Sequence, residues 1–151
     1  MWNTAFILVN CIALCCWILL IAVPRRPLPL AIVLYGGVAM LCLAYSIFML
    51  TLGVGMASGE GGLPRMGVDI FTIAGIRTLF SVDSGAVLGW THYLAFDLFV
   101  GLWIARDADA KGFSRLVQVP VLLMTCLAGP VGLLVWLVVR ERRARKLGRP
   151  T

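Results

Sequence analysis

The chain has 151 residues, of which 61% are hydrophobic and 13% are charged, and its formal net charge is +6 at pH 7. Soluble globular domains carry about 25% charged residues, so this composition excludes an ordinary soluble domain and indicates a membrane protein. Membrane topology and attraction to anionic lipids explain the basic excess, and we expect no nucleic-acid partner.

Two apolar segments, residues 4–23 and 28–50, come first. Each is long enough to cross a hydrocarbon layer of about 30 Å as a helix, the form that satisfies all backbone hydrogen bonds within the segment. The first segment lacks a basic start and a small-residue cleavage motif, so we interpret it as a retained helix and not as a signal peptide. The sequence PRRP at 24–27 predicts a tight turn between the two helices.

The connection at residues 51–85 is glycine-rich at first and apolar again at 68–80. Thirteen residues are too few to span a membrane, so this stretch predicts a short helix at the membrane interface. Arg77 is either an interfacial anchor for this helix or a partner for a carboxylate. Asp83 and Ser84 are expected to cap the next helix.

Apolar segments at 86–105 and 117–139 predict the third and fourth spanning helices. Pro120 and the Gly-Pro pair at 129–130 should bend the fourth helix, because proline removes a backbone hydrogen bond. The basic tail at 140–151 is expected to stay in the cytoplasm.

The predicted fold is therefore all-α, with a single membrane domain over residues 1–151. This polytopic domain has four transmembrane helices and a short interfacial helix between helices two and three. An even number of spans places both termini in the cytoplasm, and we expect a multi-pass protein of the cell inner (plasma) membrane, in contact with membrane lipids.

Two ionisable side chains in the third segment, His92 and Asp97, are candidates for a functional site. A charged carboxyl at mid-helix costs roughly 2.5–3.5 kcal/mol on insertion scales, so such groups usually face the protein interior and often mark function. Helical periodicity puts Asp97 on one face with Tyr93, and His92 about 140° away from it. The other side chains that offer Asp97 a charge or a hydroxyl are Arg77, Arg106 and Thr125.

Structural interpretations stay open for both residues. Asp97 would then only form a structural hydrogen bond to another helix of the bundle, and His92 would lie near the membrane interface. The five cysteines lie inside apolar segments, where cysteine behaves as a small hydrophobe, and the chain has no metal, nucleotide or hydrolase motif. We therefore expect no metal and no cofactor.

Three stretches carry a family resemblance: GIRTLF at 75–80, GWTHYLAFDLFVG at 89–101 and GPVGLL at 129–134. They resemble the abscisic acid-deficient-4-like membrane proteins, whose plant members are linked to neoxanthin synthesis. The resemblance covers roughly the second half of the chain, which looks like a bacterial-type member. Leu102 stands where the family commonly has arginine.

The resemblance implies a redox-neutral isomerisation without a cofactor. In it a carotenoid epoxide opens while a proton leaves the adjacent chain, giving an allene and a hydroxyl. His92 and Asp97 would supply the acid–base chemistry, with Tyr93 as a further proton donor. The residues that would bind the carotenoid or isoprenoid ligand are Trp90, Phe96, Trp103 and Arg77.

Two other functions remain open beside the isomerase. The first is a non-enzymatic protein that binds a carotenoid or lipid for another enzyme. The second is a small proton-coupled carrier with Asp97 as its relay group. Neither hairpin repeats the other in sequence, which weakens the carrier hypothesis.

Overall fold

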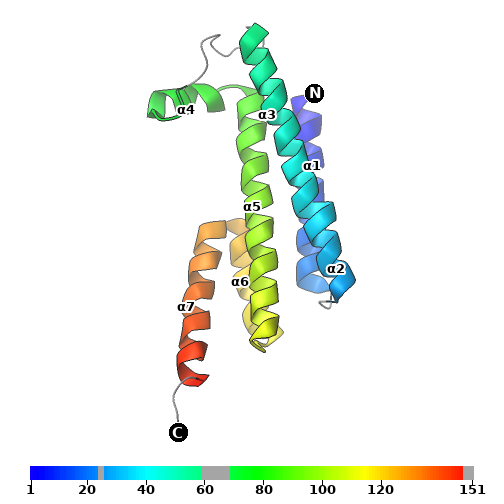
Figure 1. The fold of residues 1–151 in the computed structure, drawn as a ribbon, viewed down its shortest axis with the longest axis vertical. Helices are drawn as coiled ribbons and strands as arrows, with labels where there is room; N and C mark the ends of the chain where they lie inside the picture. The colour runs from blue at the N-terminus through cyan, green and yellow to red at the C-terminus, as the bar shows by residue number, and fades with distance from the viewer. Residues whose placement is uncertain (24–25, 59–68, 148–151) are drawn as a thin grey trace.

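The computed structural model describes residues 1–23, 26–58 and 69–147, and for residues 55–58 and 142–147 it describes the backbone only. Within these ranges every regular element is helical (Figure 1). This confirms the predicted all-α class. The helices in chain order are α1 (Trp2–Ala22), α2 (Pro27–Ala31), the π-helical stretch η1 (Ile32–Ala39), α3 (Met40–Ser58), α4 (Ile73–Phe80), α5 (Asp83–Ala110), α6 (Arg115–Leu127) and α7 (Gly129–Leu147).

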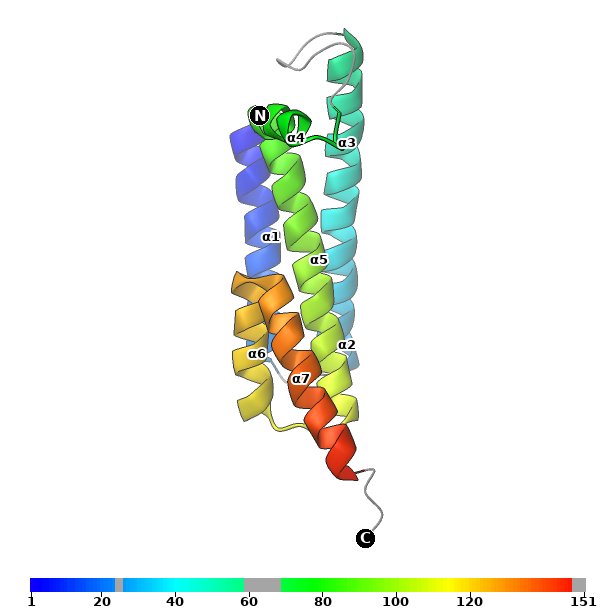
Figure 2. The ribbon, with the colours of Figure 1, turned by 90° about the vertical axis from the view of Figure 1, so that its left-hand side faces the viewer.

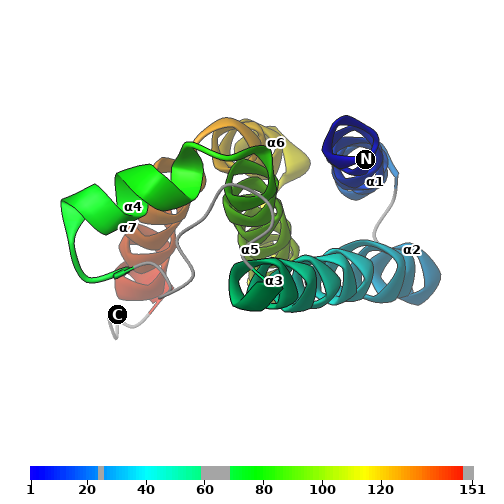
Figure 3. The same cartoon turned by 90° about the horizontal axis from the view of Figure 1, so that it is seen from above.

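Three helices among the described residues are long and apolar enough to cross a membrane. They are α1, the continuous rod of α2, η1 and α3, and α5. α5 is the central helix, and the other elements pack around it (Figure 3). The chain is therefore a multi-pass membrane protein.

Small residues let these three helices approach closely. Gly37 of the rod faces Cys16 of α1 and Leu98 of α5, and a Cβ at position 37 would come within 3.0 Å of both side chains. Gly101 of α5 leaves room for the ring of Trp17. In lipid, where water does not drive helices together, such close contact is the main source of attraction between helices.

The single helix predicted over 117–139 does not form, and the described residues contain no fourth helix that is long and apolar enough to cross a membrane. α6 ends at Leu127, α7 begins at Gly129, and α7 runs back along α6 (Figures 1 and 2). The 13-residue α6 is only about 20 Å long, too short to span the membrane. The two helices therefore form an antiparallel pair, here named the C-terminal hairpin.

The reversal has a local cause at residues 128–132. Ala128 leaves the helical region, with φ −154° and ψ 77°, and Pro130 falls in the first turn of α7, where its missing N–H costs nothing. Gly132 lies against the backbone of Thr125, so a side chain there would force the two helices apart. Pro120, by contrast, stays inside α6 without ending it.

The C-terminal hairpin also changes where the ends of the chain lie. α6 starts beside the end of α5, the hairpin tip reaches the middle of α5, and α7 returns past the level at which α6 began (Figure 2). The start of α1 and the end of α7 thus lie at opposite ends of the bundle. The expectation that both termini lie on the same side of the membrane depended on four spans, and it stays a prediction.

The short helix predicted within 68–80 is α4, which lies roughly perpendicular to α5 and extends outward from its first turns (Figures 1 and 3). The side chain of Thr72 caps it by accepting a hydrogen bond of 3.1 Å from the Gly75 N–H. The predicted caps of α5 are not observed: Val82 is its N-cap residue, and Asp83 already lies in the first turn. A carboxylate there still opposes the positive end of the helix dipole.

Candidate functional site

The candidate site is built around Asp97, at the middle of α5. Its side chain is only 8% exposed, so it points into the bundle as predicted. The carboxyl lies against Gly129 at the tip of the C-terminal hairpin, in the space that a Cβ of residue 129 would fill. Glycine at this position is therefore what allows the carboxyl and the hairpin tip to meet.

The hairpin tip offers Asp97 a positive environment made by the backbone. Gly129 begins α7, and the first N–H groups of a helix have no partner within the helix and carry partial positive charge. The N–H groups of Val131 and Gly132 donate to Ala128 O at 2.9 and 3.1 Å. The Gly129 N–H lies beside the Asp97 carboxyl.

Tyr93 lies one helical turn before Asp97 and contacts the same hairpin tip. Its hydroxyl donates a hydrogen bond of 3.3 Å to Leu127 O and lies next to the Asp97 carboxyl. The helical periodicity of the sequence placed these two residues on one face, and the structure brings them together. Tyr93 thus connects α5 to the end of α6.

One oxygen of the carboxyl stays without a partner. Asp97 Oδ2 is buried and accepts no hydrogen bond from the described residues. Buried polar atoms are nearly always hydrogen-bonded, because an unpaired one costs free energy. An exception therefore points to a functional reason for keeping the atom unpaired. An oxygen of this kind can hold or receive a proton.

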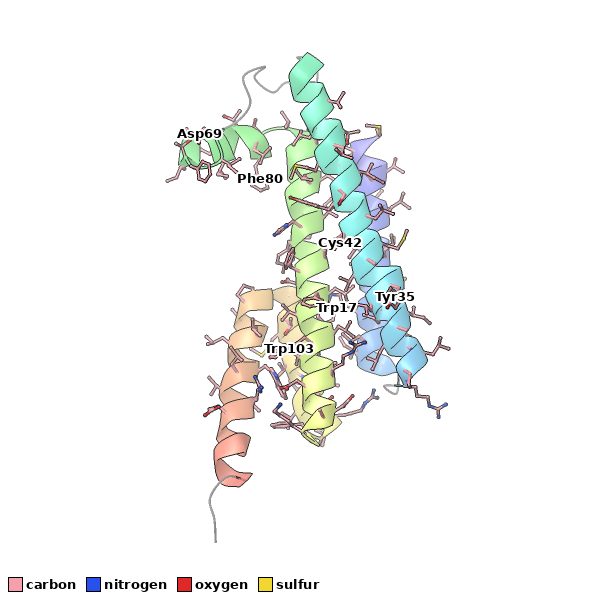
Figure 4. The ribbon with its side chains drawn as sticks, in the orientation of Figure 1. Trp17, Tyr35, Cys42, Asp69, Phe80 and Trp103 are labelled. Carbon is pink, nitrogen blue, oxygen red and sulfur yellow. The ribbon has the colours of Figure 1, made fainter. Side chains whose placement is uncertain are left out.

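An apolar pocket of about 420 Å³ lies beside Tyr93, between α1, α4 and α5. Its lining residues are Phe6, Phe80, Ala86, Val87, Gly89, Trp90 and Tyr93. Phe80 reaches down from the end of α4 toward α5, where Gly89 leaves space for its ring (Figure 4). The volume and lining are typical of sites for apolar small molecules.

The aromatic residues of this pocket are held in place by α1. The indole N–H of Trp90 donates to Asn10 Oδ1 at 3.1 Å, and its ring lies 6.0 Å from Phe6 and 5.3 Å from Tyr93, between centroids. Tyr93 is common to the pocket wall and to the surroundings of Asp97. A molecule in the pocket would therefore reach the group that contacts the buried carboxyl.

His92 belongs to another face of α5. It is exposed on the outer surface, stacks on Phe96 with 4.5 Å between ring centroids, and lies 5.4 Å from the Tyr45 ring. Trp103 continues this face toward α7, where Arg140 lies 5.6 Å from its ring (Figure 4). The structure thus separates His92, Phe96 and Trp103 from the pocket that contains Trp90.

The side-chain partners expected for Asp97 are elsewhere. Arg77 is exposed on α4 at one end of α5, and Arg106 is exposed near the other end. Thr125 is buried, but its hydroxyl donates to Val121 O at 2.8 Å. Asp97 forms no ion pair with a described residue, and its partners are Tyr93 and the backbone of Gly129.

A family model described as ABA DEFICIENT 4-like matches residues 4–136. The chain belongs to the ABA4-like family. The match includes the first two helices, for which the sequence resemblance was limited to hydropathy, and it includes Asp97, Tyr93 and the hairpin tip. Comparisons of this ABA4-like chain with curated proteins and with solved structures gave no match.

Sequence reasoning missed two parts of this ABA4-like site. Asn10, which orients Trp90, had no recognisable signal within an apolar segment. Gly129 was expected only to bend a helix, whereas in the structure it leaves room for the Asp97 carboxyl. Leu102, in place of the family's common arginine, is 2% exposed and packs in the core.

Proposed function

We propose that this ABA4-like protein is an intramembrane isomerase that opens a carotenoid or isoprenoid epoxide by acid–base chemistry. One observation carries the proposal: Tyr93 lies between an apolar pocket and the Asp97 carboxyl, one oxygen of which is buried and accepts no hydrogen bond from the described residues. The pocket fits one end of an elongated apolar molecule, and the rest of the molecule would extend along the bundle into lipid. The inner (plasma) membrane is the proposed location.

In the proposed reaction Asp97 is the base and Tyr93 is the acid. Asp97 does not line the pocket, so the reacting end of the ligand has to pass Tyr93 to reach it. A proton then leaves the carbon next to the epoxide and passes to the Asp97 carboxylate, and the C–H electron pair forms the new double bond. The epoxide C–O bond breaks, and its oxygen takes the Tyr93 hydroxyl proton. Tyr93 then recovers a proton from Asp97, so the atoms balance and no electron is gained or lost.

His92 has no part in this step, because it lies on the outer face of α5. Phe96 and Trp103 share that face, so the ligand contacts are assigned to Trp90 and its neighbours in the pocket. Arg77, on the exposed side of α4, is assigned to the membrane interface.

A binding or accessory function is the second candidate, and one contact favours it. The Asp97 carboxyl lies against the first residue of α7, where a carboxylate stabilises a helix start. Asp97 would then hold the C-terminal hairpin on α5 and leave the pocket to bind a pigment for another enzyme.

Purified protein incubated with an epoxide carotenoid distinguishes these two functions. An isomerase converts the pigment on its own, and Asp97→Asn retains binding while conversion falls by about 10²–10⁴-fold. Absorption spectra of the bound pigment and chromatography of the product give both quantities. Binding without conversion by the wild-type protein would leave only the accessory function, and His92→Phe serves as a control on the outer face.

A further inference from the structure

The basic residues of this chain gather at one end of the bundle. This end is formed by the end of α1, the start of α2, the turn between α5 and α6, and the last turns of α7 (Figure 1). Its described cations are Arg26, Arg106, Lys111, Arg115 and Arg140, and the backbone of α7 brings residues Arg142, Arg143, Arg145 and Lys146 to the same end. Among the described residues, Arg77 is the cation at the opposite end.

The C-terminal hairpin is the reason for this distribution. With four spans, the cations of the α1–α2 and α5–α6 connections would lie across the membrane from those of α7. Because α6 and α7 enter and return on the same side, all three groups share one end. A bias of this kind is the feature that retains a segment in the cytoplasm.

We infer that this basic end is a binding surface for the anionic lipid headgroups of the cytoplasmic leaflet, which places the start of α1 on the opposite side of the membrane. The inference is independent of the proposed isomerase. It concerns the surface around Arg26, Arg106 and Arg115, whose side chains are exposed. Juxtamembrane cations of this kind contribute about 1 kcal/mol each near an anionic surface.

The depth of these residues fits the headgroup region. Arg106 lies about 14 Å beyond Asp97 along α5, at a rise of roughly 1.5 Å per residue. Half of the hydrocarbon thickness is about 15 Å, so a carboxyl at mid-membrane puts Arg106 at the interface. Trp103, partly exposed one turn earlier, suits the same boundary, where tryptophan is enriched.

Neighbouring groups fix the shape of this surface. Asp107 accepts a hydrogen bond of 3.1 Å from the Trp136 indole, pairs with Arg140 at 3.2 Å, and is also bonded to Lys111. Arg115 donates to Val23 O at 2.5 Å and so joins α6 to the end of α1. Asp109 and Glu141 lie at this end too, but the cations outnumber the carboxylates there.

Reporter fusions test the orientation in the full chain. We expect a fluorescent reporter after Thr151 to be active in the cytoplasm, and a phosphatase fused before Met1 to be active only outside it. Two reporters on the same side of the membrane would overturn the inference, as would the reverse orientation.

The lipid preference is tested with protein in detergent to which lipids are added. Phosphatidylglycerol should raise the melting temperature of the wild type and of the control Arg77→Gln, and should raise that of Arg26→Gln/Arg106→Gln markedly less. Equal stabilisation by phosphatidylcholine would refute the lipid surface. Saturable binding of duplex DNA at physiological salt, without a preference for phosphatidylglycerol, would assign the surface to an acidic macromolecule and refute it as well.

Discussion

The carboxyl of Asp97 fills the space that a side chain at Gly129 would occupy. This contact joins the middle of the central helix α5 to the first residue of α7. It gives the buried carboxyl a backbone partner and gives the C-terminal hairpin a fixed position. The geometry and the chemistry of the site thus depend on one pair of residues.

Gly129→Ala should weaken the hairpin, because the new Cβ would overlap the Asp97 carboxyl. We expect a loss of about 1–3 kcal/mol in the free energy of unfolding, the usual cost of overpacking. Thermal melting in detergent measures the loss. Gly53→Ala is the control, since a Cβ at position 53 has no neighbour within 4 Å and alanine favours the helix. Equal melting temperatures for both variants would contradict the contact.

Gly37→Ala and Gly36→Ala form a second pair, one residue apart in the rod. A Cβ at position 37 would press on Cys16 and Leu98, whereas one at position 36 would make ordinary contact with Ile32 at 3.7 Å. We expect Gly37→Ala to lower the melting temperature by several degrees and Gly36→Ala to leave it nearly unchanged. A larger effect at position 36 would show that the rod faces α1 and α5 differently.

Tyr93→Phe removes the hydroxyl that contacts both Leu127 O and the Asp97 carboxyl, and it keeps the aromatic wall of the pocket. If Tyr93 is the proton donor, ligand affinity should stay within about threefold while the turnover number falls by about 10²–10⁴-fold. Titration of the pigment and single-turnover kinetics separate the two effects. An unchanged turnover number for the variant would show that Tyr93 is not the proton donor.

Trp90→Ala and Trp103→Ala compare the two aromatic faces of α5. Trp90 lines the pocket and is oriented by Asn10, whereas Trp103 lies on the outer face beside Arg140. We expect the first substitution to weaken pigment binding at least tenfold and the second to leave it unchanged. Fluorescence quenching by the pigment provides the dissociation constants. If only Trp103→Ala weakened binding, the result would indicate that the ligand binds on the outer face of α5.

The spanning helices and the interior position of Asp97 were predictable, because length, hydropathy and the cost of a charge in lipid determine them. The partner of Asp97 was not predictable from a search among side chains, since the group that meets it is the backbone at Gly129. Hydropathy also gave 117–139 as one span, because it averages over residues and does not register a reversal at Ala128.

The short α6 also has a consequence for the order in which the protein is assembled. A helix of its length is not retained in a bilayer by its own hydrophobicity, so the C-terminal hairpin can settle only after α5 offers it a surface. The three spanning helices would then insert first, and the last quarter of the chain would dock onto them. Asp97 can therefore meet the N–H of Gly129 only after α6 and the start of α7 have been made and have packed on α5.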